Sequence, residues 1–381
     1  MATIPVRPLP SLSALGLCAA FLIGPAHAAT PAVHKVAAPS DLQPLPMVSS
    51  GRILITPAPA AADFGGKDYT AQWPGIYFRA AFTGPTVFFR IGKSNEILHI
   101  VVDDETAPPF VKPDPGVYQV GGLRNSDHII AVLVATESQD GPNTFGGFAI
   151  PADEKALRVA PTRRQIEFIG DSHTVGYGVL SAKHDCPNGQ VWSNTDHTSA
   201  FGPIIARHYH ADYQVNAISG RGIVRNYNGF PADTLPQAYP FVLFDKKQRY
   251  DDPAWKPSVI VVALGTNDFS TPLNPGEHWK TRDELHADYE STYVHFFAEM
   301  RTHNPKADIV VWATDMADGE IATEANKVVQ QRRQQGDAYI TFLSISGLSL
   351  GACDWHPSLG DEKIIADRLV HAIDADSHAW Q

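Results

Sequence analysis

The sequence predicts two domains: an all-β domain followed by an α/β domain with a mostly parallel sheet. From Gly51 to Ile150, short segments of alternating apolar and polar residues are separated by Gly, Pro and Asp, with no convincing amphipathic helix between them. Such alternation is typical of antiparallel strands. From Thr162 onward, short apolar segments alternate with helix-like segments, which is typical of βα units around a parallel sheet.

The first domain is expected to be a β-sandwich over residues 46–160, with strands in GRILIT, GIYFRAAF, TVFFRI, ILHIVVDD, GVYQVGG, HIIAVLVAT and FGGFAI. The second, over residues 161–381, has expected strands in QIEFIG, YQVNAIS, SVIVVALG, DIVVWAT and YITFLS. Its expected helices are SAFGPIIARHYH, ELHADYESTYVHFFAEMRTH, ANKVVQQRRQQG and DEKIIADRLVHAI. The second helix carries aromatic residues at helical spacing, which indicates a buried stripe of Tyr289, Tyr293, Phe296 and Phe297.

The N-terminus has the pattern of a secretory signal peptide over residues 1–28. Arg7 provides a positive charge, residues 12–23 form an apolar stretch, and Ala26-His27-Ala28 is a small-x-small cleavage site. The apolar stretch is too short for a comfortable membrane span. We therefore expect a secreted or periplasmic protein without a membrane anchor. Residues 29–45, rich in Ala and Pro, are expected to be a linker.

The charge and the cysteine content indicate which classes of partner and which redox compartment suit this chain. Lys and Arg number 30 against 41 Asp and Glu, and the net charge of −11 argues against a nucleic-acid partner. Removal of the signal peptide would leave two cysteines, Cys186 and Cys353. An even count in an oxidising compartment allows one disulfide, and two unpaired buried thiols are the alternative.

Candidate catalytic residues follow the predicted parallel strands, where loops of such sheets gather functional groups. The first strand ends in Gly170-Asp171-Ser172, and glycine permits the tight turn that would expose the serine. Gly220 follows the second strand and Asn267 the third, so a backbone N–H and a side-chain amide could face the same crevice. Taken singly, these residues are also ordinary turn and helix-cap residues.

A candidate base lies near the C-terminus, where Asp354 and His356 precede the last helix. A serine hydroxyl hardly ionises near neutral pH, so it needs a neighbouring base such as histidine. A carboxylate can then fix the imidazole tautomer. Alone, His356 would be a surface or packing histidine; in series with Ser172, it completes a nucleophile and base in one α/β domain.

Four segments, FIGDSHTVGYG, NAISGRG, LGTND and DWHP, resemble the conserved blocks of the SGNH-hydrolase superfamily, also called the GDSL family, over residues 163–381. This resemblance implies a flavodoxin-like parallel sheet. The superfamily usually places its aspartate three residues before the histidine, a position that Cys353 occupies here, whereas Asp354 lies two residues before His356. That spacing, the preceding β-domain and the segments WPGIYFRAAFTGPTV, GGLRNSDHIIAVLVATES and GRGIVRNYNG resemble carbohydrate esterase family 2.

That family joins an N-terminal jelly roll to an SGNH domain and acts on O-acetylated sugars of plant cell-wall polysaccharides. The resemblance implies an acetyl esterase that uses Ser172 as nucleophile and His356 as base, with either Asp354 or a backbone carbonyl orienting the histidine. It also implies an oxyanion hole made by the Ser172 N–H, the Gly220 N–H and the Asn267 amide.

Two tryptophans, Trp355 and Trp192, are candidates for stacking on a sugar ring, with core packing as the alternative. No cofactor or metal is expected, because no phosphate-binding loop or convincing zinc ligand set is present; in HYH at 208–210, the two histidines would point apart on a helix. The resemblance to carbohydrate esterase family 2 implies an acetylated carbohydrate of xylan, mannan or xyloglucan type as substrate. The alternatives are an SGNH lipase or thioesterase for longer acyl chains, and a non-catalytic carbohydrate-binding protein.

Overall fold

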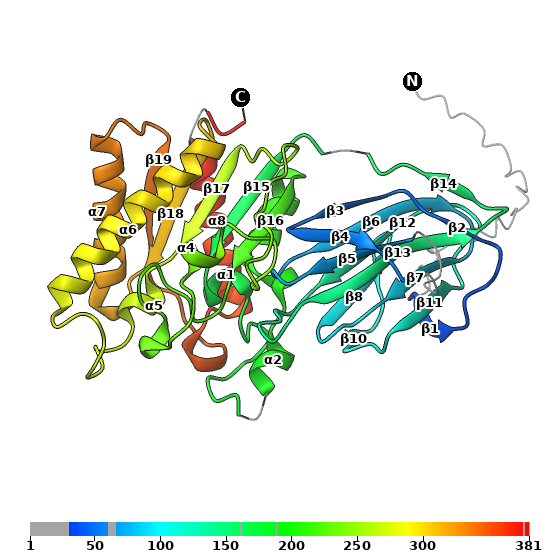
Figure 1. Cartoon of the computed structure of the whole chain (residues 1–381), viewed down its shortest axis with the longest axis horizontal. Coiled ribbons are helices and arrows are strands. Elements are labelled where there is room, and N and C mark those ends of the chain that lie inside the picture. Colours follow the sequence, from blue (N-terminus) through cyan, green and yellow to red (C-terminus); the bar gives the residue numbers. More distant parts are fainter. Residues whose placement is uncertain (1–29, 60–65, 161, 188, 376–377, 381) are drawn as a thin grey trace, which may run out of the picture.

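The computed structural model describes residues 30–59, 66–160, 162–187, 189–375 and 378–380, which form a β-domain and an α/β domain side by side (Figure 1). The expected signal peptide lies outside the described residues. Within those residues, none of the helices has the length and apolar character needed to span a bilayer.

In the part that the structure describes, the β-domain consists of two antiparallel seven-stranded sheets. The order of the first sheet is β1 (Ala32–Val36), β11 (Gly116–Gly121), β7 (Val87–Ile91), β13 (Asn143–Pro151), β5 (Lys67–Ala71) and β4 (Ile53–Pro57), with β2 (Leu42–Pro44) paired to β13. The order of the second is β10 (Phe110–Val111), β8 (Ile97–Val102), β12 (Asp127–Val134), β6 (Tyr77–Thr83) and β14 (Lys155–Leu157), with β3 (Met47–Ser50) on β6 and β9 (Glu105–Thr106) on β8. Aromatic side chains from both sheets are buried in one core, among them Phe82, Phe89 and Phe148. All seven strands expected in this region are present, in a jelly-roll-like sandwich.

The structure corrects the interpretation of residues 29–45 as a linker over the part of that range that it describes, residues 30–45. Strand β1 pairs with β11 from Ala32↔Gly121 to Val36↔Val117, and β2 pairs with β13. Both short strands are mostly half-buried or exposed, so their sequence carries little of the apolar alternation that marks a strand. Backbone hydrogen bonds to a neighbouring strand hold them in the sheet, and a pattern search on side chains does not detect such bonds.

The α/β domain contains the five expected strands in one parallel sheet. Its order is β16 (Asp212–Ala217), β15 (Gln165–Gly170), β17 (Val259–Ala263), β18 (Asp308–Thr314) and β19 (Ile340–Ile345). The chain leaves β15 toward β16 and then returns to the other side of β15 to form β17. This reversal creates a switch point at the carboxyl ends of β15 and β17, where open α/β sheets bind ligands.

Helices cover both faces of the parallel sheet. Alternate residues of β17 point to opposite sides: Val262 belongs to the core under α6 (Arg282–His303), and Val261 to the core under α3 and α8. The remaining long helices are α3 (Phe201–Tyr209), α7 (Glu320–Gln334) and α8 (Leu359–Ala375). Figure 1 shows α6 and α7 at the end of the molecule away from the β-domain. The expected aromatic stripe of α6 is confirmed, since its members are at most 2% exposed.

Several polar contacts join the two domains. The Arg79 guanidinium lies 2.6 Å from the Asp212 carboxylate at the start of β16. The His197 N–H donates to the Ala135 carbonyl oxygen at 2.6 Å, immediately after β12. This last contact holds the loop that follows β12 against the α/β domain.

Candidate active site

Ser172 lies at the switch point of the parallel sheet, at the start of a short helix. Strand β15 ends at Gly170, and α1 (Ser172–Val175) begins after the N-cap residue Asp171. Glycine is required at position 170, because a Cβ atom there would collide with the Thr174 side chain. The serine is thereby held at the carboxyl edge of the sheet, 5% exposed.

The His356 imidazole contacts the serine directly. Its Nε2 lies 2.8 Å from Ser172 Oγ, and its Nδ1 lies 2.9 Å from the Cys353 carbonyl oxygen and 3.1 Å from that of Asp354. Because carbonyl oxygens only accept hydrogen bonds, Nδ1 must carry the proton, which leaves Nε2 free to accept the proton of the serine hydroxyl. Burial lowers the pKa of His356, although the two carbonyl contacts oppose this shift. The imidazole is therefore neutral near pH 7, as a general base must be.

The Asp354 carboxylate does not meet the imidazole. It accepts a hydrogen bond from the Tyr177 hydroxyl at 3.1 Å, and burial together with this carboxylate raises the pKa of Tyr177 to about 12. Asp354 and Trp355 have φ values of 50° and 61°, in the left-handed region that non-glycine residues rarely adopt. This turn directs main-chain carbonyls at His356. Of the two orienting groups that the sequence left open, the structure brings the carbonyl into contact and not the carboxylate.

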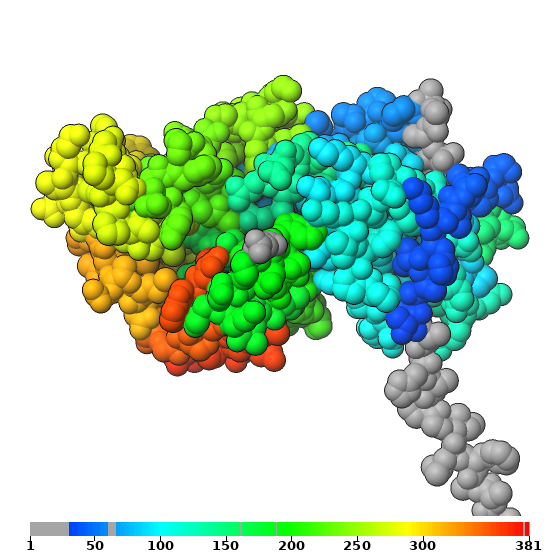
Figure 2. All heavy atoms as spheres, turned by 90° about the horizontal axis from the view of Figure 1, so that it is seen from below, coloured from blue at the N-terminus to red at the C-terminus, as the bar shows by residue number. Residues whose placement is uncertain are grey.

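The disulfide expected between Cys186 and Cys353 is present, with a Cα–Cα distance of 5.5 Å. The Asp354 N–H also donates to the His184 carbonyl oxygen at 2.8 Å, next to the bridge. In Figure 2, the green segment that follows Ser172 and the orange-red segment that precedes α8 lie side by side. The bridge thus fixes the residue whose carbonyl faces the base.

The two further candidate oxyanion donors lie at the ends of the neighbouring strands. Gly220 follows β16, and Asn267 lies in α5 (Thr266–Phe269) after β17; both line the cavity that contains Ser172. The Asn267 side-chain nitrogen donates to the Arg221 carbonyl oxygen at 2.9 Å and to the Asp171 carboxyl group at 3.1 Å. If the Asn267 amide donated a hydrogen bond to an oxyanion, that bond would replace one of these two.

Burial disfavours the charged forms of two ionisable side chains next to Ser172. It raises the pKa of Asp171 to about 7, and the nearby Asp268 adds to this shift. Burial also lowers the pKa of His173 to about 3, so this histidine is neutral. Among the described residues, no group of three or more His, Cys, Asp or Glu side chains is arranged to hold a metal ion.

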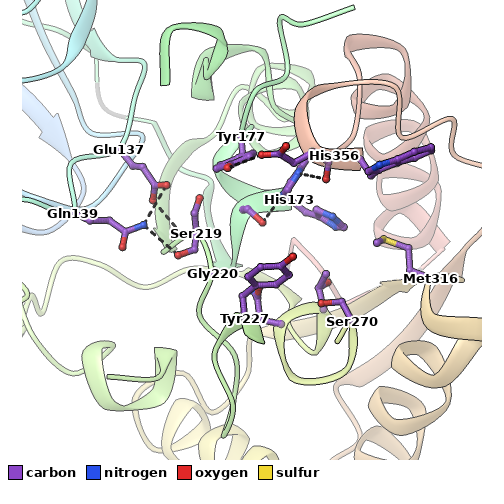
Figure 3. A pocket seen from close by; sticks show the side chains of 15 residues that line it. Glu137, Gln139, His173, Tyr177, Ser219, Gly220, Tyr227, Ser270, Met316 and His356 are labelled. Atoms are coloured by element: carbon purple, nitrogen blue, oxygen red, sulfur yellow. Dashed lines mark hydrogen bonds between the residues drawn. The ribbon is translucent and has the colours of Figure 1, made fainter. Parts of the chain in front are cut away.

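The cavity above Ser172 measures about 680 Å³ and is lined by residues of both domains (Figure 3). Trp355 lines it, is 62% exposed, and stacks on the His184 ring with centroids 3.7 Å apart. Trp192, in α2 (Gln190–Asn194), lies beneath the Lys112 ammonium group at 4.3 Å and is not among the described residues that line the cavity. The structure therefore brings one of the two candidate tryptophans to the site.

Sequence reasoning missed several lining residues. Glu137 and Gln139 come from the β-domain, just after β12. Tyr177 follows α1, and Tyr227 begins a short 3-10 helix over Tyr227–Gly229 in the α/β domain. Tyr177 stands inside the GDSHTVGYG block, so its closeness to Ser172 could have been inferred. Glu137 lies near the end of the segment GGLRNSDHIIAVLVATES and Gln139 follows it, but that segment gave no indication of a place at the site, because the packing of one domain against the other brings both residues here.

Fold and contacts together define a serine hydrolase whose catalytic domain has a parallel sheet covered by helices, and comparison with known proteins identifies its family. Residues 63–161 match the carbohydrate esterase 2 N-terminal family, and residues 168–363 match the GDSL-like lipase/acylhydrolase family. The chain is 39% identical over 344 residues to an acetylxylan esterase / glucomannan deacetylase of Cellvibrio japonicus (strain Ueda107), covering 90% of this chain and 94% of that protein. The chain belongs to carbohydrate esterase family 2 and is a carboxylic-ester hydrolase.

Solved structures agree with this assignment. One is a carbohydrate esterase whose active site displays divergent catalytic and non-catalytic binding functions; it matches with a TM-score of 0.83 and 39% identity, over 89% of this chain and all of that one. Another is a family two carbohydrate esterase from Clostridium thermocellum in complex with cellohexaose, with a TM-score of 0.73 and 27% identity, over 87% of this chain and 98% of that one.

Replacing Asp354 by Asn tests which group orients the base. Because the His356 Nδ1 faces carbonyl oxygens, we expect Asp354→Asn to keep kcat for p-nitrophenyl acetate within about tenfold of wild type. Loss of an orienting carboxylate costs about 10⁴-fold in a serine protease. A loss of that size, in a variant with unchanged thermal unfolding, would assign the orienting role to the carboxylate. Tyr177→Phe, which removes the same hydrogen bond from the other side, is the matched control.

Removing the disulfide should affect both stability and turnover. In the double variant Cys186→Ser/Cys353→Ser, we expect a stability loss on the order of 2–4 kcal/mol. We also expect a lower kcat, because the Cys353 carbonyl that faces His356 is less firmly held. Thermal unfolding and ester kinetics, each with and without dithiothreitol, provide the measurement. Dithiothreitol should reproduce both effects in the wild type and change nothing in the variant; an insensitive wild type would contradict the expectation.

Proposed function

We propose that this protein is a secreted O-acetyl esterase that removes acetyl groups from plant cell-wall polysaccharides or their oligosaccharides. The observation that carries the proposal is the 2.8 Å contact between Ser172 Oγ and His356 Nε2 at the floor of a cavity whose rim holds the exposed Trp355. The names of relatives support the substrate class: one is an acetylxylan esterase / glucomannan deacetylase, and another was solved with cellohexaose.

The proposed reaction is a two-step acyl transfer. His356 takes the proton of Ser172 as the serine oxygen attacks the acetyl carbonyl carbon, and the carbonyl oxygen becomes an oxyanion. The protonated His356 then gives this proton to the sugar oxygen, which leaves as a free hydroxyl, and the acetyl group remains on Ser172. Water repeats the sequence with His356 as base, and acetate is released.

Three donors are proposed to stabilise the oxyanion: the Ser172 N–H, the Gly220 N–H and the Asn267 side-chain amide. All three residues line the cavity. Removal of one such donor from a hydrolase typically costs roughly 3–4 kcal/mol in the transition state. The neutral state of His173 beside them avoids a second cation that would disfavour protonation of His356 during the reaction.

Secretion is supported by the signal-like residues 1–28 and by the disulfide between Cys186 and Cys353. Disulfides persist in oxidising compartments, including the periplasm and the cell exterior. A polysaccharide substrate is also found outside the cell, so substrate and enzyme would meet there.

The function is tested by following acetate release from acetylated xylan and acetylated glucomannan. We expect release by the wild type, and a loss of about 10³-fold or more in Ser172→Ala with unchanged unfolding. In a series of p-nitrophenyl esters, acetyl should be hydrolysed faster than butyryl and octanoyl. A preference for octanoyl would favour the lipase alternative. Sugar binding without any esterase activity in the wild type would favour a non-catalytic binding protein.

Trp355 is proposed to stack on a sugar ring of the substrate. Trp355→Ala should raise KM for acetylated polysaccharide by about 2- to 10-fold, which corresponds to about 0.5–1.5 kcal/mol of aromatic contact. Trp355→Phe should recover part of this loss. For p-nitrophenyl acetate, which has no sugar, KM should stay within about twofold. An equal rise in KM for both substrates would place Trp355 in local packing instead.

A further inference from the structure

The loop that carries Gly220 is a β-turn whose central peptide can adopt two orientations. The Arg221 N–H donates to the Ile218 carbonyl oxygen at 3.2 Å, and Gly220 has a φ of 80°. Since Ser219, the second residue, has no positive φ, the positive φ at the third position makes this a type II turn, which differs from type I mainly by a flip of the central peptide. Glycine tolerates either sign of φ, so the glycine by itself does not select one orientation.

That central peptide contains both the Ser219 carbonyl and the Gly220 N–H. In a trans peptide, the C=O and the N–H point to opposite sides. A group that holds the Ser219 oxygen therefore also determines the direction of the Gly220 N–H. Gly220 lines the cavity, so a flip would turn a carbonyl oxygen to the side on which the proposed donor N–H lies, and that oxygen would repel an oxyanion.

Two side chains of the β-domain hold this turn. The Gln139 side-chain amide donates to the Ser219 carbonyl oxygen at 3.2 Å, and Glu137 Oε2 accepts from the Ser219 N–H at 3.1 Å. Gln139 also donates to Glu137 Oε1, at 3.4 Å. Figure 3 shows Glu137 and Gln139 on one side of Ser219 and His356 on the other.

The pair is itself fixed in place. The loop after β12 is held by the bond from the His197 N–H to the Ala135 carbonyl, and Arg221 donates to the Gln139 amide oxygen at 3.4 Å. This last contact leaves the amide nitrogen of Gln139 directed at Ser219. Burial raises the pKa of Glu137, while its hydrogen bonds with Ser219 and Gln139 oppose this shift.

We infer that Gln139 and Glu137 are positioning residues that keep the Ser219–Gly220 peptide in its type II orientation, so that the β-domain completes the oxyanion hole. The inference rests on the proposed function, because it takes the Gly220 N–H as an oxyanion donor. An interaction used only in the transition state affects kcat and leaves KM nearly unchanged.

The test removes the donor of Gln139. We expect Gln139→Met to lower kcat for p-nitrophenyl acetate by about 10- to 100-fold, less than the 10²- to 10³-fold typical for removal of an oxyanion donor itself. KM should stay within about twofold. Glu137→Gln keeps an acceptor for the Ser219 N–H and should retain more activity than Glu137→Ala. Arg79→Gln, which breaks an interdomain ion pair elsewhere, is the control: it should lower the unfolding temperature and keep kcat.

A second readout separates orientation from general loosening. Phenylboronic acid forms a tetrahedral adduct with an active serine, so its inhibition constant should rise in Gln139→Met in proportion to the loss of kcat. Wild-type kcat in Gln139→Met, or unchanged boronate inhibition, would overturn the inference. So would a loss of kcat that Arg79→Gln reproduces. If Ser172→Ala remains active, the proposed function itself fails. If Ser172→Ala is inactive but the Gln139 and Glu137 variants behave as wild type, the proposed function stands and the inference alone fails.

Discussion

The contact between the Cys353 carbonyl oxygen and His356 Nδ1 is the constraint on which the geometry of the site depends. It places the proton on Nδ1 and turns Nε2 toward Ser172, so the serine has a base in reach. The short segment Cys353–Trp355 that supplies this carbonyl contains two left-handed residues, Asp354 and Trp355, a conformation that costs about 1–3 kcal/mol each. The disulfide to Cys186 holds that strained segment against the loop that follows the nucleophile.

A carbonyl in place of a carboxylate changes the electrostatics of the base. A buried carboxylate would favour the imidazolium strongly and raise the pKa of His356, whereas the carbonyl dipoles only partly offset the burial that lowers it. The imidazole is therefore neutral near pH 7, and less of the charge that would develop on it is compensated. Stabilisation of the opposite charge, on the oxyanion, then has a larger share in lowering the barrier. This makes the direction of the Gly220 N–H consequential.

Much of the fold and the closeness of Ser172 to His356 could be predicted, because local sequence determines them. The runs QIEFIG and DIVVWAT lie in buried parallel strands and are apolar on both faces, and Ser172 and His356 stand in recognisable blocks at strand ends. The edge strand Ala32–Val36 could not be predicted, because its hydrogen-bond partner lies about a quarter of the chain away and its side chains carry no alternation. The role of Asp354 was undetermined for a related reason: two φ values, invisible in the sequence, decide whether its carboxylate or a neighbouring carbonyl faces the imidazole.

Glu137 and Gln139 show what a second domain adds to such a site. The parallel sheet alone brings Ser172, Gly220 and Asn267 to one edge, but Gly220 tolerates either orientation of the Ser219–Gly220 peptide, so the glycine itself does not fix it. A neighbouring element with a fixed backbone can hold this peptide. Strand β12 is such an element, because it pairs with both β6 and β8 along most of its length. Glu137 and Gln139, just beyond the end of β12, are held by this pairing and contact the Ser219 peptide across the domain boundary.

Preorganised donors stabilise a developing charge without reorganising during the reaction, so a fixed turn lowers the barrier more than a mobile turn would. The jelly-roll-like domain is thus part of the wall and support of the active site, which gives a physical reason for the two domains to occur together in one chain.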